Sequence, residues 1–148
     1  MSETWVIADV REGDLPTLAG LVAFALRPGD TVTLAGNLGA GKTTLARALI
    51  RALLADPAAE VPSPTFSLVQ TYATPRFPVA HADLYRLADA ADLTELGLDE
   101  ALAAGAALIE WPERAAAQLP SDRLAITFEE ARTADARTLT FAATGDWQ

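Results

Sequence analysis

The stretch Gly36-Asn37-Leu38-Gly39-Ala40-Gly41-Lys42-Thr43 matches the phosphate-loop motif G-x-x-x-x-G-K-[ST] at every fixed position. Glycines permit positive φ angles and let backbone N–H groups approach phosphate oxygens without an obstructing Cβ. The motif predicts that Lys42 reaches the β- and γ-phosphates and that the Thr43 hydroxyl is a ligand of Mg²⁺. The residues expected to bind the cofactor here are Asn37, Leu38, Gly39, Ala40, Gly41, Lys42, Thr43 and Thr44.

The segments on either side of this loop have the pattern that the motif requires. Residues 31–35 are an apolar run typical of a buried strand, and residues 44–54 carry leucines on one helical face. Such a helix would direct its positive N-terminal end at the phosphates. The alternative is a glycine-rich turn that matches by chance, but Lys42 is the only lysine among eleven basic residues. The sequence therefore predicts a nucleoside triphosphate site.

Composition limits the other possibilities. The chain has 148 residues, which is typical of one domain, and its hydrophobic content of 51% excludes global disorder. It has no cysteine, which excludes disulfides and thiolate chemistry. The formal charge of −9 and the scattered basic residues give no basic cluster for direct nucleic-acid binding. The N-terminus lacks the features of a signal peptide, so we expect a cytoplasmic protein.

Two segments after the loop carry polar residues that could complete a site. Ser63-Pro64-Thr65-Phe66 is held extended by prolines, and it is either a switch segment near the γ-phosphate or an ordinary loop. Asp83 follows the apolar strand expected at 79–81, where ligands bind in open α/β sheets, or it is a surface carboxylate. His81 is the only histidine, which excludes a multi-histidine metal site, and a lone histidine is more often structural.

A third segment resembles a Walker B element. Residues 106–109 are apolar, and Glu110 is the first charged residue at the end of this expected strand. An acid there orients Mg²⁺ or a water beside a phosphate loop. A strand followed by an acid is common by chance, so the interpretation depends on the complete loop upstream.

The remaining periodicity completes a mixed α/β pattern without a repeat, linker or second domain. Asp14 is expected to cap a helix whose residues Leu18, Leu21, Val22 and Ala25 share one face. The other expected strands are 5–8, 66–72, 123–130 and 138–143, the last two forming a hairpin, and the other expected helices are 15–26, 92–97, 98–104 and 112–119.

Four segments together resemble one family, the bacterial TsaE/YjeE ATPases. They are GNLGAGKTT at 36–44, SPTF at 63–66, HADLYRL at 81–87 and EWPE at 110–113. The resemblance covers nearly the whole chain, and the last three motifs are far more specific in combination than the phosphate loop. It implies a three-layer α/β P-loop NTPase fold with parallel core strands flanked by antiparallel strands.

The same resemblance implies the function and the roles of the site residues. It implies Mg²⁺-dependent ATP hydrolysis that is slow alone and depends on the TsaB and TsaD proteins, during synthesis of threonylcarbamoyladenosine in tRNA. The tRNA would be contacted only through these partners. By resemblance, Lys42 and Thr43 would hold phosphate and Mg²⁺, Glu110 would be the Walker B acid, Thr65 and Asp83 would lie in switch-like segments, and Trp111 would lie beside the nucleotide. We therefore expect Lys42, Asp83 and Glu110 to be the catalytic residues, and Thr43 and Glu110 to hold Mg²⁺.

Several alternatives remain open from the sequence. Asp83 either orients water or helps to hold Mg²⁺, and no arginine is clearly placed as a finger, with Arg86 the nearest candidate. A small-molecule kinase would need a lid with several arginines, whereas the arginines here are scattered singly. A non-hydrolysing nucleotide switch that docks partners is the third hypothesis. No base-reading motif distinguishes ATP from GTP.

Overall fold

The computed structural model describes residues 3–37, 41–62, 68–85, 87, 96–115, 119–120, 122–131 and 136–144 of the chain. The strands are β1 (Glu3–Arg11), β2 (Thr31–Ala35), β3 (Val69–Ala73), β4 (Pro78–Asp83), β5 (Ala106–Glu110), β6 (Arg123–Glu130) and β7 (Ala136–Thr144). The α-helices are α1 (Leu15–Ala25), α2 (Lys42–Leu54) and α3 (Leu98–Ala104), and two short 3₁₀ helices are η1 (Glu12–Asp14) and η3 (Pro112–Arg114).

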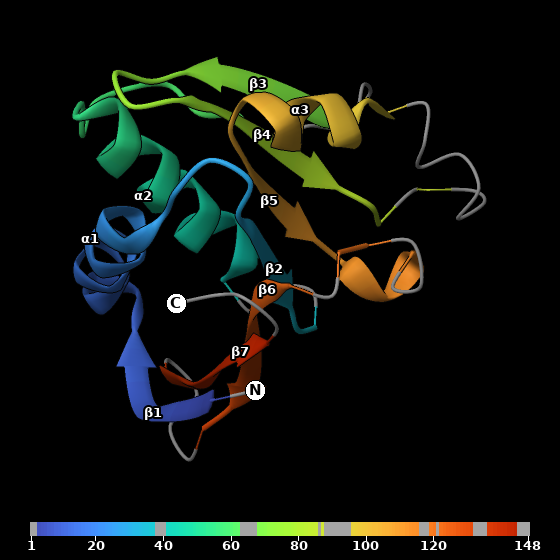
Figure 1. Ribbon diagram of the computed structural model, residues 1–148. Coiled ribbons are helices and arrows are strands. Elements are labelled where there is room, and N and C mark those ends of the chain that lie inside the picture. The colour runs from blue at the N-terminus through green and yellow to red at the C-terminus, as the bar shows by residue number, and fades with distance from the viewer. Residues whose placement is uncertain are drawn as a thin grey trace.

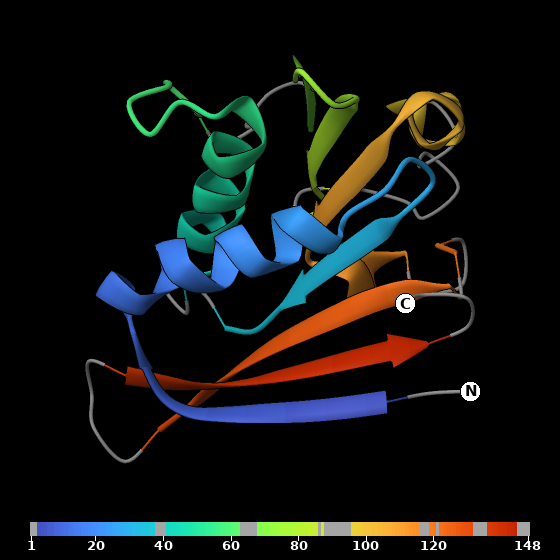
Figure 2. The ribbon, with the colours of Figure 1, turned by 60° about the vertical axis from the view of Figure 1, so that its left-hand side comes forward.

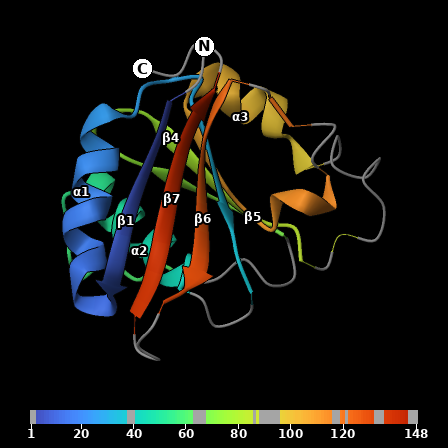
Figure 3. The same cartoon turned by 90° about the horizontal axis from the view of Figure 1, so that it is seen from below.

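The seven strands form one sheet in the order β1-β7-β6-β2-β5-β4-β3. The four central strands β6, β2, β5 and β4 are mutually parallel. Antiparallel strands flank them, with β7 and β1 on one side and β3 on the other. Figure 3 shows β1, β7 and β6 side by side with α1 beside them. The predicted P-loop NTPase fold, with parallel core strands and antiparallel flanks, is confirmed.

The sheet is covered on both faces, which gives three layers. Along β5, Ala106 and Leu108 pack in the cluster that contains α1 and α2. Ala107 and Ile109 pack in a second cluster that contains Leu98 of α3. This alternation follows from the two-residue period of a strand. Figures 1 and 2 show α1 and α2 close together and α3 apart from them.

The helix that follows β2 has the face that the sequence predicts. Leu45, Leu49 and Leu53 are buried, whereas Arg47 and Arg51 are partly exposed. The burial of α1 differs from the prediction. Leu21 is 65% exposed and Ala25 is also exposed, while Ala19 and Ala23 are buried instead. Val22 is buried and Leu18 packs partly buried against the core, as the sequence predicts.

Three other local expectations were wrong in detail. Asp14 stands at the N-cap position of α1 as expected, but it has helical dihedrals and makes no side-chain cap hydrogen bond to α1; its Oδ2 instead accepts a hydrogen bond from the Arg11 N–H. β3 begins at Val69, since Leu68 has a φ of 63° that interrupts the extended backbone; residues 66 and 67 of the strand expected at 66–72 lie outside the described residues. Of the helix expected at 112–119, η3 covers 112–114, Ala115 leaves the helical region at φ −148°, and 116–118 lie outside the described residues. The helix expected at 92–97 lies largely outside the described residues.

Two contacts fix how the elements around β4 and α1 fit together. Gly105 precedes β5, and a Cβ built on it would lie 1.8 Å from the Pro78 carbonyl oxygen, so only glycine allows β5 this close to β4. The Arg76 guanidinium donates hydrogen bonds to the carbonyls of Ala23 and Leu26 and thereby caps the end of α1.

None of the helices in the described part of the chain has the length and hydropathy of a membrane span.

Candidate functional site

The predicted site residues meet where parallel strands end and α2 begins. β2 leads into the phosphate loop, and α2 starts directly at Lys42. Gly41 has a φ of 106°, a left-handed conformation that favours glycine, and its Cβ would already touch the Phe128 ring at 3.4 Å. The carboxyl ends of β4 and β5 lie beside this turn because both strands run parallel to β2 in the sheet. This is the edge at which open α/β sheets bind ligands.

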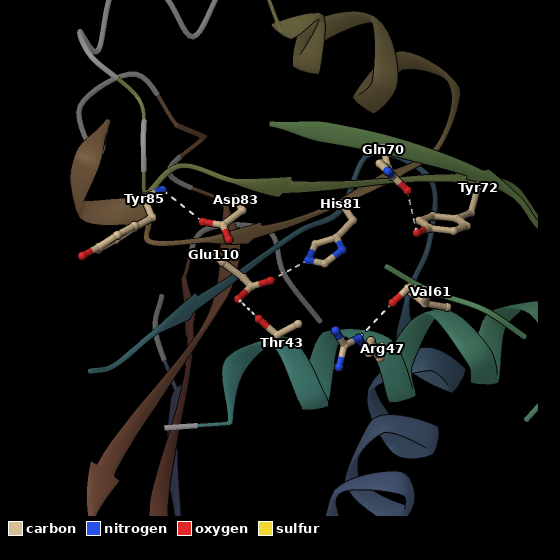
Figure 4. A network of polar contacts seen from close by, with 9 residues as sticks. All are labelled: Thr43, Arg47, Val61, Gln70, Tyr72, His81, Asp83, Tyr85 and Glu110. Atoms are coloured by element: carbon tan, nitrogen blue, oxygen red, sulfur yellow. Dashed lines mark hydrogen bonds and ion pairs between the residues drawn. The ribbon is translucent and has the colours of Figure 1, made fainter. Parts of the chain in front are cut away.

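Glu110 is the centre of a buried polar network that Figure 4 shows from close by. Its Oε1 accepts a hydrogen bond of 2.7 Å from the Thr43 hydroxyl. Its Oε2 lies 2.6 Å from His81 Nε2. Glu110 is 1% exposed, so these two partners replace the water that a carboxylate otherwise requires. The contact with Thr43 joins the acid at the end of β5 to the last residue of the phosphate-loop motif.

His81 has a specific protonation pattern in this network. It is fully buried on β4, two residues before Asp83. An ionised carboxylate only accepts hydrogen bonds, so His81 Nε2 carries the proton that Glu110 accepts. Its Nδ1 is buried and has no hydrogen-bond partner among the described residues. Glu110 is therefore the polar partner that holds this ring in the described structure.

The Lys42 side chain points toward its own loop and toward Trp111, the residue that follows β5. Its Nζ donates hydrogen bonds to the carbonyls of Gly36 and Asn37, the second at 2.8 Å. The same ammonium lies 4.0 Å from the centroid of the Trp111 ring, within the range of a cation–π contact. Burial lowers the pKa of Lys42 from its ordinary value, and the carboxylates of Glu110, Glu113 and Asp83 oppose this shift.

Trp111 stands at a sharp corner immediately after β5. It has a φ of 59°, and its N–H donates a hydrogen bond of 3.2 Å to the Leu34 carbonyl of β2. Its ring lies 4.7 Å from the Tyr85 ring, and the Arg114 guanidinium lies 5.4 Å from the Tyr85 ring. The two aromatic rings are thus in contact with each other, and each also has a cation beside it: Lys42 beside Trp111 and Arg114 beside Tyr85.

Asp83 is the neighbour of Glu110 across the β4–β5 pair. Its Oδ1 accepts a hydrogen bond of 3.0 Å from the Tyr85 N–H. Burial raises its pKa above the ordinary 3.8, Glu110 adds to this effect, and the Tyr85 hydrogen bond, His81 and Lys42 oppose it. A partly buried carboxylate with a raised pKa beside a phosphate loop is a candidate proton acceptor.

Two arginines of α2 hold the chain that comes after the helix. Arg47 Nε donates a hydrogen bond of 2.9 Å to the Val61 carbonyl, and Arg51 Nε donates one of 2.9 Å to the Ala59 carbonyl. The chain after α2 is thereby tied to the helix up to residue 61. The interpretation of 63–66 as a switch segment, including Thr65, lies outside the described residues.

The described structure brings together five of the predicted site residues, namely Lys42, Thr43, Asp83, Glu110 and Trp111, with Asn37, Gly41 and Thr44 adjoining them along the chain. The predicted ligands Leu38, Gly39 and Ala40 lie outside the described residues, as does Arg86.

Sequence reasoning missed two residues of the site, His81 as a partner of Glu110 and Tyr85 as a partner of Trp111. The spacing H-x-D was the available signal, because residues two apart on a strand point to the same face.

The oxygen donors of the site suit Mg²⁺. Because the Thr43 hydroxyl uses its proton on Glu110, its lone pairs remain for a cation. Carboxylate and hydroxyl oxygens are hard ligands, and Mg²⁺ is usually held by one or two side chains together with phosphate oxygens and water. Within the described ranges, no group of three or more His, Cys, Asp or Glu residues could hold a metal by itself.

The fold and this site define a P-loop NTPase-type α/β protein. The family model "Threonylcarbamoyl adenosine biosynthesis protein TsaE" matches residues 11–139, and the chain belongs to the TsaE family.

Individual relatives agree with this assignment. The TsaE protein of Rickettsia bellii is 39% identical over 118 residues, covering 80% of this chain and 81% of the relative. The TsaE protein of Bacillus subtilis is 38% identical over 138 residues, covering 93% of this chain and 84% of the relative. The crystal structure of Bacillus subtilis YdiB superimposes with a TM-score of 0.80 at 33% identity, covering 99% of this chain and 89% of that one.

Proposed function

We propose that this protein is an ATP-hydrolysing accessory subunit in the biosynthesis of threonylcarbamoyladenosine in tRNA. The pathway follows from membership of the TsaE family. The observation that carries the hydrolytic part is the hydrogen bond between Thr43 and Glu110. It joins the magnesium-binding position of the phosphate loop to a buried acid at the end of β5, as phosphoryl transfer requires.

In the proposed mechanism, Lys42 and the loop N–H groups hold the β- and γ-phosphates. Thr43 and Glu110 would hold Mg²⁺, which offsets the charge that develops on the phosphate oxygens when it is bound. To reach the phosphates, the Lys42 ammonium has to leave the carbonyls of Gly36 and Asn37.

Asp83 is the residue that we propose orients the attacking water. Within the described part of the chain, no hydrogen bond joins its carboxylate to Thr43 or Glu110, so it remains available for another partner. Its raised pKa also suits proton transfer at neutral pH better than an ordinary aspartate does.

Dependence on the TsaB and TsaD proteins is a further part of the proposal. The formal charge of −9 favours contact with tRNA through partners rather than directly. An arginine finger raises the rate of phosphoryl transfer by roughly 10³- to 10⁵-fold, so an ATPase that obtains this element from a partner is slow alone. We propose a cytoplasmic protein that acts as one P-loop domain over its 148 residues.

The test is Mg-ATP hydrolysis by the protein alone and with its cognate TsaB and TsaD, compared with Lys42→Ala. Stimulation by the partners that is lost in Lys42→Ala would support the proposal. ATP binding without hydrolysis in any mixture would instead favour a nucleotide-dependent docking switch. Phosphorylation of an added metabolite would favour a small-molecule kinase.

A further inference from the structure

We infer that His81 is a positioning residue, whose Nε2–H holds the Glu110 carboxylate in the orientation that receives the divalent cation beside Thr43. The inference rests on the proposed function, because it concerns the same site. It starts from the 2.6 Å contact between His81 Nε2 and Glu110 Oε2, which Figure 4 shows opposite the contact with Thr43.

The geometry of Glu110 requires two donors rather than one. Its side chain has three rotatable bonds, and a single hydrogen bond from Thr43 would leave the carboxylate free to rotate about the Oε1 contact. A second donor on Oε2 fixes the plane of the carboxylate. Because the Glu110 side chain is buried, loss of either donor would also leave a charged oxygen without a partner.

The burial of His81 supports a specific role over simple core packing. It lies on the face of β4 that also carries the buried Val79, and its ring is fully enclosed. Its Nδ1 has no partner among the described residues, so burial of this ring is costly. The hydrogen bond to Glu110 is the contact in the described structure that offsets this cost, and an aliphatic residue would pack there without it.

The test compares His81→Gln with His81→Asn. Glutamine places its amide N–H at about the reach of Nε2, whereas asparagine has the same chemistry but is too short to reach Glu110. His81→Leu removes the donor and retains bulk. The readout is binding of Mn²⁺ in the presence of ADP, followed by the electron paramagnetic resonance of free Mn²⁺, with ATP hydrolysis measured separately.

We expect His81→Asn and His81→Leu to weaken Mn²⁺ binding roughly 10- to 100-fold, the usual effect of losing a partner of a metal ligand. His81→Gln should remain close to the wild type. Thr31→Val is the matched control. Thr31 is also fully buried, and its Oγ1 is also unpartnered in the described structure. It lies at the start of β2, whereas the phosphate loop follows the end of this strand. This control should leave Mn²⁺ binding unchanged.

Equal Mn²⁺ binding by the wild type and the three His81 variants, or an equal loss in His81→Gln and His81→Asn, would overturn the inference. Thermal unfolding identifies a variant that does not fold, and if His81→Leu fails in this way the Gln and Asn pair still decides. If the wild type binds Mn²⁺ with ADP but does not hydrolyse ATP with its partners, the proposed ATPase function fails while the Gln and Asn comparison still decides the role of His81. If the wild type binds no Mn²⁺ with ADP, both fail.

Discussion

The ammonium group of Lys42 lies 4.0 Å from the centroid of the Trp111 ring. The two residues come from different motifs, the phosphate loop after β2 and the corner after β5. Their contact means that the Lys42 side chain, which we propose binds phosphate, already has a defined position, held by two carbonyls and one aromatic face. The proposed phosphate binding would exchange these contacts for stronger ones, and this exchange would have measurable effects.

Lys42→Met should weaken ATP binding roughly 10- to 100-fold, because hydrogen bonds to a charged group contribute about 1.5–3 kcal/mol. Methionine keeps an apolar stem against Trp111 while it removes the ammonium. Titration with a fluorescent ATP analogue measures the affinity. Arg27→Ala is the control: it removes one positive charge just after the C-terminal end of α1 and should leave the affinity for the ATP analogue unchanged. Equal affinity in both variants would contradict the assignment of Lys42.

Glu110→Gln should retain nucleotide binding and lose hydrolysis. Glutamine preserves the volume and an oxygen acceptor for Thr43, and its amide N–H can donate to His81 Nε2 when the ring proton moves to Nδ1, whereas alanine would leave His81 Nε2 without its partner in a buried place. Loss of a preorganised electrostatic group in such a site typically lowers kcat by about 10²- to 10³-fold. Single-turnover hydrolysis measures this step. Unchanged turnover in Glu110→Gln would exclude Glu110 from the chemistry.

The fluorescence of Trp111 should report nucleotide binding. Withdrawal of the Lys42 ammonium from the ring changes the local field on the indole, so its emission should shift when Mg-ATP is added. Trp5 and Trp147 must be replaced by Phe to isolate the signal. In that background, adding Lys42→Ala should abolish the response. A response that survives Lys42→Ala would have to arise from another contact.

Asp83→Asn should make the protein more stable at neutral pH and less active. Because burial raises the pKa of Asp83, the folded state binds this proton more tightly than the unfolded chain does. The favourable contribution of Asp83 is therefore complete below its ordinary pKa of 3.8 and is lost as pH rises through the raised pKa. Asparagine stays neutral and can still accept the Tyr85 hydrogen bond.

The gain in the free energy of unfolding from Asp83→Asn should thus be present at pH 7 and vanish toward pH 4, as urea unfolding would show. Asp122→Asn controls for the loss of one charge at an exposed position. Hydrolysis by Asp83→Asn should fall by about 10²- to 10⁴-fold if Asp83 accepts the proton of water. Full activity would exclude Asp83 from the proton transfer.

Gly105→Ala should destabilise the fold by about 1–3 kcal/mol, the usual cost of overpacking. The new methyl group would meet the Pro78 carbonyl oxygen at 1.8 Å, so β4 and β5 would have to separate. Gly20→Ala is the matched control, because Gly20 lies in α1 and a Cβ added to it would have no atom within 4 Å. It should stabilise the protein by about 0.8–1 kcal/mol. Urea unfolding measures both, and a neutral Gly105→Ala would contradict the close approach.

The regular elements near the site could be predicted because each is specified locally. β2, α3 and β6 have the expected bounds, and Glu110 ends its strand as expected, since apolar runs, glycines and prolines mark these boundaries within a few residues. The buried face of α1 was only partly right: Val22 is buried and Leu18 packs against the core as expected, whereas Leu21 faces outward and Ala19 and Ala23 are buried in addition.

The pairing of His81 with Glu110 could not be read from the sequence. The two residues are 29 positions apart, and only the adjacency of β4 and β5 brings them together. The H-x-D spacing places His81 on the same face of the strand as Asp83, but it does not identify Glu110 as the partner. The same reason hid the contact of Tyr85 with Trp111, which depends on a positive φ that no local rule predicts for tryptophan.

The pairing of β1 with β7 determines when β1 can join the sheet during synthesis on the ribosome. Glu3 of β1 is aligned with Ala143 of β7, so β1 has its partner only after β7 has been synthesised. At about 5–20 residues per second, β1 waits roughly 7–28 seconds for β7. During that time Trp5, Val6 and Ile7, which are partly exposed even in the finished sheet, lack the strand that later pairs with them. The candidate site residues Lys42, Thr43, Asp83 and Glu110 all precede β7 in the sequence, so they are synthesised before β1 can pair at the edge of the sheet.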